Sequence, residues 1–178
     1  MGAKENRSYS RVDTRLRAHA RRVASPQSPP LFRSSPQISS QPTESSLRES
    51  GIPEGLRTYL ELINSKLDML LSVTSQNRLE ADYPLKLEVV ELSGAGLRCI
   101  KPAEDLPIGQ GLELVLLLSS MPLHMAAAIG VVKRLESLEE AEHLIVEFTQ
   151  MRESDRAAIV QFVFREQREQ IRTKRQED

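Results

Sequence analysis

The first regular pattern in the chain is an alternation of apolar and charged positions from residue 11 to residue 22. Val12 and Leu16 belong to the apolar set, and Asp13 and Arg17 belong to the charged set. A repeat of two residues is that of a β-strand with one buried face. One strand is not stable alone, so this segment predicts a strand that pairs with later parts of the chain.

A second pattern, over residues 54–78, has the spacing of an amphipathic helix. Its main apolar positions are separated by four, three, four and three residues: Leu56, Leu60, Ile63, Leu67 and Leu70. The helix either packs on its own domain or associates with a second copy, because a 4-3 spacing is a short heptad repeat. Two heptads are fewer than a coiled coil normally needs, so packing on its own domain is the preferred interpretation.

The segment from residue 84 to residue 150 predicts further strands. Its apolar runs are 85–90, 97–100, 112–118, 125–134 and 144–148. With the first strand they make about six short strands, joined mostly by tight connections. Strands and helices do not alternate along the chain. The pattern therefore predicts a mainly β fold, an antiparallel barrel closed on itself so that no strand edge stays unpaired.

Residues 152–174 predict a C-terminal helix that begins near Glu153 or Ser154. The apolar side chains expected to face the barrel are Ile159, Phe162, Val163 and Ile171. The side chains expected to stay in solvent on the opposite face are Arg156, Arg165 and Arg168. A helix with one apolar stripe and one charged face is typical of a surface helix.

The composition changes abruptly between the first strand and the first helix. Residues 24–53 contain nine serines and six of the ten prolines. Such a segment has too little apolar surface to offset the entropy of ordering it, so we expect a flexible linker. The expected organisation is thus a basic arm with the first strand at residues 1–23, then the linker, the helix, the rest of the barrel and the C-terminal helix.

The net charge of -1 excludes a uniformly basic nucleic-acid binder. The charge is unevenly distributed along the chain. Residues 1–23 contain seven basic and two acidic side chains, for a net charge of +5, and residues 24–178 contain 17 basic and 23 acidic side chains, for -6. The single cysteine, Cys99, excludes an internal disulfide and fits a reducing compartment. The apolar runs are too short to cross a bilayer and no secretory signal is evident, so we expect a cytoplasmic protein without a membrane span.

The sequence contains no recognisable catalytic site, so we expect neither enzyme activity nor a bound metal or cofactor. The three histidines, His19, His124 and His143, have no metal-ligand spacing to another histidine, a cysteine or paired carboxylates. No phosphate-binding glycine loop or G-x-S-x-G nucleophile turn occurs. Cys99 falls in an apolar strand pattern, where a structural role is expected rather than a reactive one.

Two short motifs have the chemistry to bind a ligand. Arg7 and Arg11 lie four residues apart just before the first strand, and guanidinium groups suit both phosphates and the faces of nucleobases. Glu91, Ser93 and Gly96 end a later strand in a polar turn. Taken alone, the first motif is typical of a solvated basic tail and the second of an ordinary hairpin.

Taken together, the R-x-x-x-R run and the later E-x-S-x-x-G turn resemble the PilZ family of bacterial cyclic di-GMP receptors, whose second motif is D/N-x-S-x-x-G. The resemblance covers residues 6–22 and about 84–166, and the helix at residues 54–78 is similar to the inserted helix of one PilZ subgroup. It implies a six-stranded antiparallel PilZ-type barrel with an inserted helix and a C-terminal helix. It also implies that Arg7 and Arg11 contact the phosphates and guanine faces of cyclic di-GMP.

By the same resemblance, the opposite wall of that site comes from Glu91, Ser93 and Gly96. A carboxylate accepts hydrogen bonds from a guanine edge, a serine hydroxyl bonds a polar edge, and a glycine lets the backbone approach the ligand. Glu91 is one methylene longer than the family's Asp or Asn, which predicts a lower affinity. The resemblance leaves open whether one nucleotide binds or two.

The resemblance implies a receptor that orders its N-terminal arginine segment when cyclic di-GMP binds and that signals to an unidentified protein partner. The alternative is a nucleotide-independent PilZ-like adaptor that oligomerises or binds partners through the leucine-rich helix. A nucleic-acid polymer is a less favoured ligand, because no basic surface with interleaved aromatic residues accompanies the arm.

Overall fold

The computed structural model describes residues 9–32, 51–120, 123–138 and 141–177. The strands and helices in this part of the chain are β1 (Arg11–Val23), α2 (Glu54–Asp82), β2 (Leu85–Ser93), β3 (Gly96–Ile100), β4 (Gly111–Ser120), β5 (Leu123–Leu138), β6 (Ala141–Met151) and α3 (Glu153–Glu177). Arg7 and linker residues 33–50 lie outside the described residues. The flexibility of the linker and the position of Arg7 therefore stay predictions.

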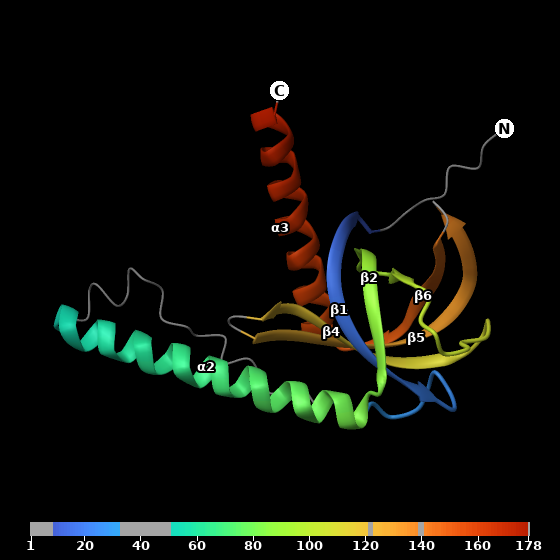
Figure 1. Cartoon of the computed structure of the whole chain (residues 1–178), viewed down its shortest axis with the longest axis horizontal. Coiled ribbons are helices and arrows are strands. Elements are labelled where there is room, and N and C mark those ends of the chain that lie inside the picture. The colour runs from blue at the N-terminus through green and yellow to red at the C-terminus, as the bar shows by residue number, and fades with distance from the viewer. Residues whose placement is uncertain (1–8, 33–50, 121–122, 139–140, 178) are drawn as a thin grey trace.

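The six strands form a closed barrel in the order β1-β2-β3-β6-β5-β4, and every neighbouring pair is antiparallel. Figure 1 shows the two helices outside the barrel, α2 inserted between β1 and β2 and α3 following β6. The predicted mainly β fold with an inserted and a C-terminal helix is confirmed. Strand β5 extends beyond the apolar run that predicted it, because its last residues pair with β6 in a hairpin that is largely exposed.

A mainly aliphatic core fills the barrel. Its largest fully buried side chains are Leu92, Leu112, Leu114, Leu116, Leu144 and Ile159. Cys99 is fully buried as well, and burial raises the pKa of its thiol to about 12. Such a thiol carries almost no thiolate near neutral pH, which agrees with the structural role expected of this cysteine.

Helix α3 buries apolar side chains against the barrel through its N-terminal half only. Ile159, Phe162 and Val163 are buried there, as expected. Ile171 faces the barrel as predicted, because it lines an open cleft with Arg11 and Val12 of β1, but it is 53% exposed and lies outside the core. The reason is geometric: α3 runs away from the barrel toward its C-terminus, and its described side chains are exposed from Arg168 to residue 175 (Figure 1).

Helix α2 meets the barrel only near its C-terminal end. Leu79 and Tyr83 join Val115 in a second small apolar cluster on the outer side of the barrel. A helix of 29 residues is roughly 44 Å long, and the rest of α2 extends away from the barrel (Figure 1). The preferred interpretation, that α2 packs on its own domain, is therefore wrong for most of its length. Within the described residues, no helix is long and apolar enough to cross a membrane.

The buried carboxylate of Glu113 fixes the point where α2 leaves the barrel. It accepts hydrogen bonds from the Tyr83 hydroxyl at 2.8 Å and from the backbone N–H of Phe32 at 2.9 Å. The Arg21 guanidinium lies 2.6 Å from its second oxygen. Burial by itself raises the pKa of Glu113, but the hydrogen bonds from the Phe32 and Leu31 N–H groups, Tyr83 and Arg21 outweigh it and hold that pKa below its usual value. One side chain of β4 thus holds Phe32, which precedes α2, and Tyr83, which follows it.

Candidate functional site

The antiparallel register of β1, β2 and β3 brings the two predicted ligand motifs together. Arg11 lies opposite Ser93, and Asp13 lies opposite Glu91. On the other side of β2, Glu91 lies opposite Arg98 of β3. Neighbours on adjacent strands share one face of a sheet, so the first arginine of β1 and the polar end of β2 form a single surface.

Glu91 is held between two arginines at this surface. Arg11 Nη1 lies 3.1 Å from its Oε1, and Arg98 Nη1 lies 3.0 Å from its Oε2. Arg98 also reaches Glu136 of β5 at 3.4 Å, and Arg134 Nε donates to the other oxygen of Glu136 at 2.6 Å. The Arg134 hydrogen bond, with smaller contributions from Arg98 and Arg11, holds the pKa of Glu136 below its usual value. We call these five residues the charge cluster; with three guanidinium groups and two carboxylates it carries one excess positive charge.

Ser93 and Gly96 shape the turn at the end of β2. The buried Ser93 hydroxyl donates to the backbone carbonyl of Gly96 at 3.1 Å and accepts from the N–H of Ala95 at 3.3 Å. A Cβ atom at Gly96 would overlap the backbone carbonyl oxygen of Val146 in β6. Ser93 and Gly96 therefore each have a structural role in the turn, in addition to the ligand-binding role expected of them.

An aromatic residue of the N-terminal arm covers this turn. A Cβ atom at Gly94 would lie 2.5 Å from Cδ1 of Tyr9, so the Tyr9 ring rests directly on the turn backbone. Arg156 of α3 donates to the Gly94 carbonyl at 3.0 Å and to the Tyr9 hydroxyl at 3.3 Å. Its guanidinium also lies 5.8 Å from the centre of the Tyr9 ring, within the range of a cation–π contact. Arg156 is therefore half-buried, and the prediction that it stays in solvent is wrong.

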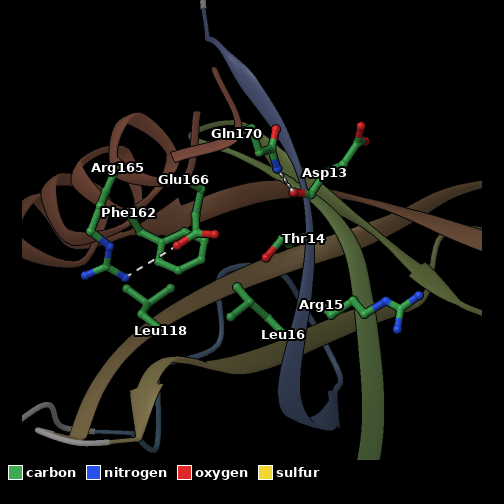
Figure 2. A pocket seen from close by; sticks show the side chains of 9 residues that line it. All are labelled: Asp13, Thr14, Arg15, Leu16, Leu118, Phe162, Arg165, Glu166 and Gln170. Carbon is green, nitrogen blue, oxygen red and sulfur yellow. Dashed lines mark hydrogen bonds and ion pairs between the residues drawn. The ribbon is translucent and has the colours of Figure 1, made fainter. Parts of the chain in front are cut away.

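Helix α3 lies beside the start of β1, in the place where β4 would otherwise pair with that strand. Strand β1 pairs with β4 only from Ala18 onward. Before that point, Gln167 donates to the carbonyl of Arg11 at 2.7 Å and Gln170 donates to that of Asp13 at 2.7 Å, as Figure 2 shows for Gln170. Two amide side chains thus replace strand hydrogen bonds and connect the N-terminal arm to α3.

Two open clefts lie between β1 and α3. The first has a volume of about 540 Å³ and is lined by Asp13, Thr14, Arg15, Leu16, Leu118, Phe162, Arg165, Glu166 and Gln170 (Figure 2). The second, of about 530 Å³, is lined by residues that include Arg11, Gln167 and Lys174. The second cleft includes Arg11 of the charge cluster, whereas Glu91, Ser93 and Gly96 line neither cleft.

The structure thus brings together Arg11, Glu91, Ser93 and Gly96, and Arg7 lies outside the described residues. Reasoning from the sequence missed Arg98, Arg134 and Arg156. For Arg98 a signal existed, because it lies two residues after Gly96 on the predicted β3 and so returns beside Glu91. The other two offered no signal, since they reach the surface from β5 and α3. Among the described residues, no group of three or more His, Cys, Asp or Glu side chains could hold a metal ion.

Comparison with known proteins places this surface on a known fold. No family model and no curated protein matches the chain. The Xanthomonas campestris protein described as a tetrameric PilZ domain self-assembled via a helical bundle is similar to it over 92% of this chain and 91% of that one, with 19% identity and a TM-score of 0.54. The chain has a PilZ-type fold. The resemblance inferred from the two motifs is thereby confirmed at the level of the fold.

A second solved structure is similar to the same PilZ-type domain. It is the Bacillus subtilis inhibitor of motility, MotI/DgrA, with 13% identity and a TM-score of 0.51. The similarity covers 92% of this chain and 51% of that one, so this chain spans about half the length of the Bacillus protein. At these identities the comparisons concern the PilZ-type fold alone, and the ligand has to be argued from the charge cluster.

Proposed function

We propose that this protein is a receptor that binds cyclic di-GMP without transforming it. The observation that carries the proposal is the meeting of Arg11 and Glu91, 3.1 Å apart on the outer face of a PilZ-type barrel. These residues belong to the two motifs that resemble the ligand motifs of the PilZ family. Arg7 and Arg11 bind the phosphates and guanine faces, and Glu91, Ser93 and Gly96 form the facing wall.

The electrostatics of the surface favour an anion. Arg98 on β3 and Arg134 on β5 extend the positive charge of Arg11 on β1 across the surface of the barrel. Cyclic di-GMP carries two negative phosphates and two flat bases, and arginine both pairs with phosphate and stacks on bases. A ligand of charge -2 would therefore gain from a cluster with one excess positive charge and from the basic arm before it.

The receptor signals through the ordering of its N-terminal segment. The arm is connected to α3 by Gln167, which donates to the Ser10 hydroxyl at 2.5 Å and to the Arg11 carbonyl at 2.7 Å. A ligand that draws Arg11 toward its phosphate changes the position of the backbone that these bonds hold. We infer that the change reaches a protein partner through α3.

Calorimetric titration with cyclic di-GMP tests the receptor proposal. The native chain should release or absorb heat with a saturable profile, and the Arg7→Ala/Arg11→Ala variant should bind at least tenfold more weakly, because charge-assisted contacts are lost. Arg172→Ala is the matched control, since it removes an exposed arginine of α3. The proposal is contradicted if the native chain does not bind, or if Arg7→Ala/Arg11→Ala binds as tightly as the Arg172→Ala control.

A second candidate function is self-association through α2. The apolar face formed by Leu56, Leu60, Ile63, Leu67 and Leu70 is 38–63% exposed along the whole set. Apolar surface of this extent on one helix face marks an interaction site. The similar Xanthomonas domain is described as a tetramer held by a helical bundle, which supports the same assembly here.

This second function could accompany the receptor function or replace it, as in a nucleotide-independent adaptor. Light scattering of the purified chain should give a mass of two or more copies, and Leu60→Gln/Leu67→Gln should reduce it to one copy. Ile108→Gln is the control, because Ile108 is 64% exposed in the β3–β4 connection, away from α2. A native chain of monomeric mass contradicts self-association, and a native chain that oligomerises without binding the nucleotide favours the adaptor.

A further inference from the structure

We propose that Glu91 is an affinity-lowering residue of the ligand site, which competes with the ligand phosphate for Arg11. The proposal rests on the proposed cyclic di-GMP function. The ion pair between Arg11 and Glu91 occupies the guanidinium that the ligand needs. Binding therefore requires Arg11 to exchange a carboxylate of the protein for a phosphate of the nucleotide.

The burial of the three partners shows which one moves in this exchange. The Glu91 side chain is 18% exposed and that of Arg98 is 24% exposed, whereas that of Arg11 is 45% exposed. Glu91 and Arg98 are also direct cross-strand partners, while Arg11 lies two residues further along the register, opposite Ser93. Glu91 is therefore held in place by Arg98, and Arg11 is the group free to turn toward a ligand.

The charges around Glu91 sharpen the expected effect of neutralising it. Asp13 lies directly opposite Glu91 on β1, and Glu136 is the second carboxylate within reach of Arg98. Glu91→Gln keeps the size of the side chain and an oxygen acceptor, so Arg98 keeps Glu136 and one hydrogen bond to residue 91. Arg11 loses its nearest anion, and the charge cluster gains one positive charge toward the phosphates.

The two possible roles of Glu91 predict opposite results. If Glu91 competes for Arg11, Glu91→Gln should bind cyclic di-GMP about twofold to fivefold more tightly, the size expected from releasing a partly exposed ion pair. If the Glu91 carboxylate mainly accepts hydrogen bonds from guanine, the same variant should bind more weakly, because a charged acceptor becomes a neutral one.

The experiment is calorimetric titration of the full chain with cyclic di-GMP at physiological salt, for the native protein, Glu91→Gln and Glu147→Gln. Glu147 is the matched control, because it is an exposed glutamate of β6 opposite Gly96 and is paired 3.3 Å from Lys133. Glu147→Gln removes the same charge from the neighbouring surface without releasing Arg11. Thermal unfolding of each variant checks that it is folded.

Tighter binding by Glu91→Gln alone supports the proposal. Binding by that variant when the native chain fails to bind supports the affinity-lowering role of Glu91 and contradicts the receptor function of the native chain. Equal or weaker binding by Glu91→Gln overturns the proposal and leaves the receptor function standing. Equal tightening in Glu147→Gln overturns it too, because the effect is then one of general charge. If neither the native chain nor Glu91→Gln binds, the receptor function and the proposal both fail.

Discussion

The ring of Tyr9 lies on the backbone of Gly94, so close that a methyl group at residue 94 would come within 2.5 Å of it. The contact joins the N-terminal arm to the turn between β2 and β3, and Arg156 of α3 completes it by bonding both residues. The arm, the turn and α3 therefore meet at one point beside the charge cluster. Changes at this point should alter how the arm is held without unfolding the barrel.

Gly94→Ala should release Tyr9 from the turn. The added methyl group takes the place of the ring, and the unfolding free energy should change by less than about 1 kcal/mol, because Tyr9 is partly exposed and stands outside the core. Hydrogen exchange of residues 9–13 should become faster in the variant. Tyr9→Ala should have the same effect, and unchanged exchange in both variants would show that this contact does not hold the arm.

Gly96→Ala should destabilise the fold itself. The new Cβ would meet the Val146 carbonyl oxygen well inside the 3.0 Å that such atoms keep, and a backbone atom of a central strand cannot move aside easily. We expect a loss of about 2–3 kcal/mol in chemical denaturation, the size of a steric overpacking effect. Ala95→Gly in the same turn serves as the control. Surface substitutions usually change the unfolding free energy by less than about 0.5 kcal/mol. A loss that small in Gly96→Ala would mean that β3 and β6 separate readily.

Neutralising Glu113 should remove part of the pH dependence of stability. The folded-state pKa of Glu113 lies below its ordinary value of 4.5, so its carboxylate stabilises the fold above that value and ceases to do so as the pH falls through the folded pKa. Glu113→Gln should lower the unfolding free energy near pH 7 by about 3 kcal/mol, since a buried charge pair with Arg21 is broken.

The difference in unfolding free energy between the native chain and Glu113→Gln should become smaller as the pH is lowered from about 6 toward about 3. The change should follow roughly the titration of a single carboxylate. Glu142→Gln, which changes an exposed glutamate paired with Lys101, should leave the denaturation midpoint almost unchanged. A difference in unfolding free energy that stays constant across this pH range would mean that Glu113 acts through shape and hydrogen bonding instead of charge.

Gln167→Ala/Gln170→Ala should loosen the contact between α3 and the start of β1. The carbonyls of Arg11 and Asp13 lose their donors, and water can replace them, so the stability cost should be below about 1 kcal/mol per bond. The measurable change is faster hydrogen exchange in β1 before Ala18 and in the second half of α3. Glu169→Ala, on an exposed position of α3, should leave both regions unchanged. Hydrogen exchange as slow in the double variant as in the native chain would contradict a role for these bonds in connecting the arm to α3.

The fold was largely predictable because each strand carries its own local pattern. The alternation around Val12 and the apolar run of β4 required burial on the barrel side whatever their partners were. The exposure of Ile171 and of most of α2 was not predictable. An apolar stripe shows that a helix has a face to bury, but whether the barrel extends far enough to cover it depends on the tertiary structure.

The candidate site divides in the same way. Arg7, Arg11, Glu91, Ser93 and Gly96 were recognisable because their motifs are short and local. Arg98 lies beside Glu91 through the pairing of β2 with β3, whereas Arg134 joins the charge cluster only through the pairing of β3, β6 and β5. The sequence by itself determined the strands, the ligand motifs and the division of charge between residues 1–23 and the rest. Only the tertiary structure decided that Arg11 is paired with Glu91, because contacts between residues 80 apart depend on register, which local patterns do not encode.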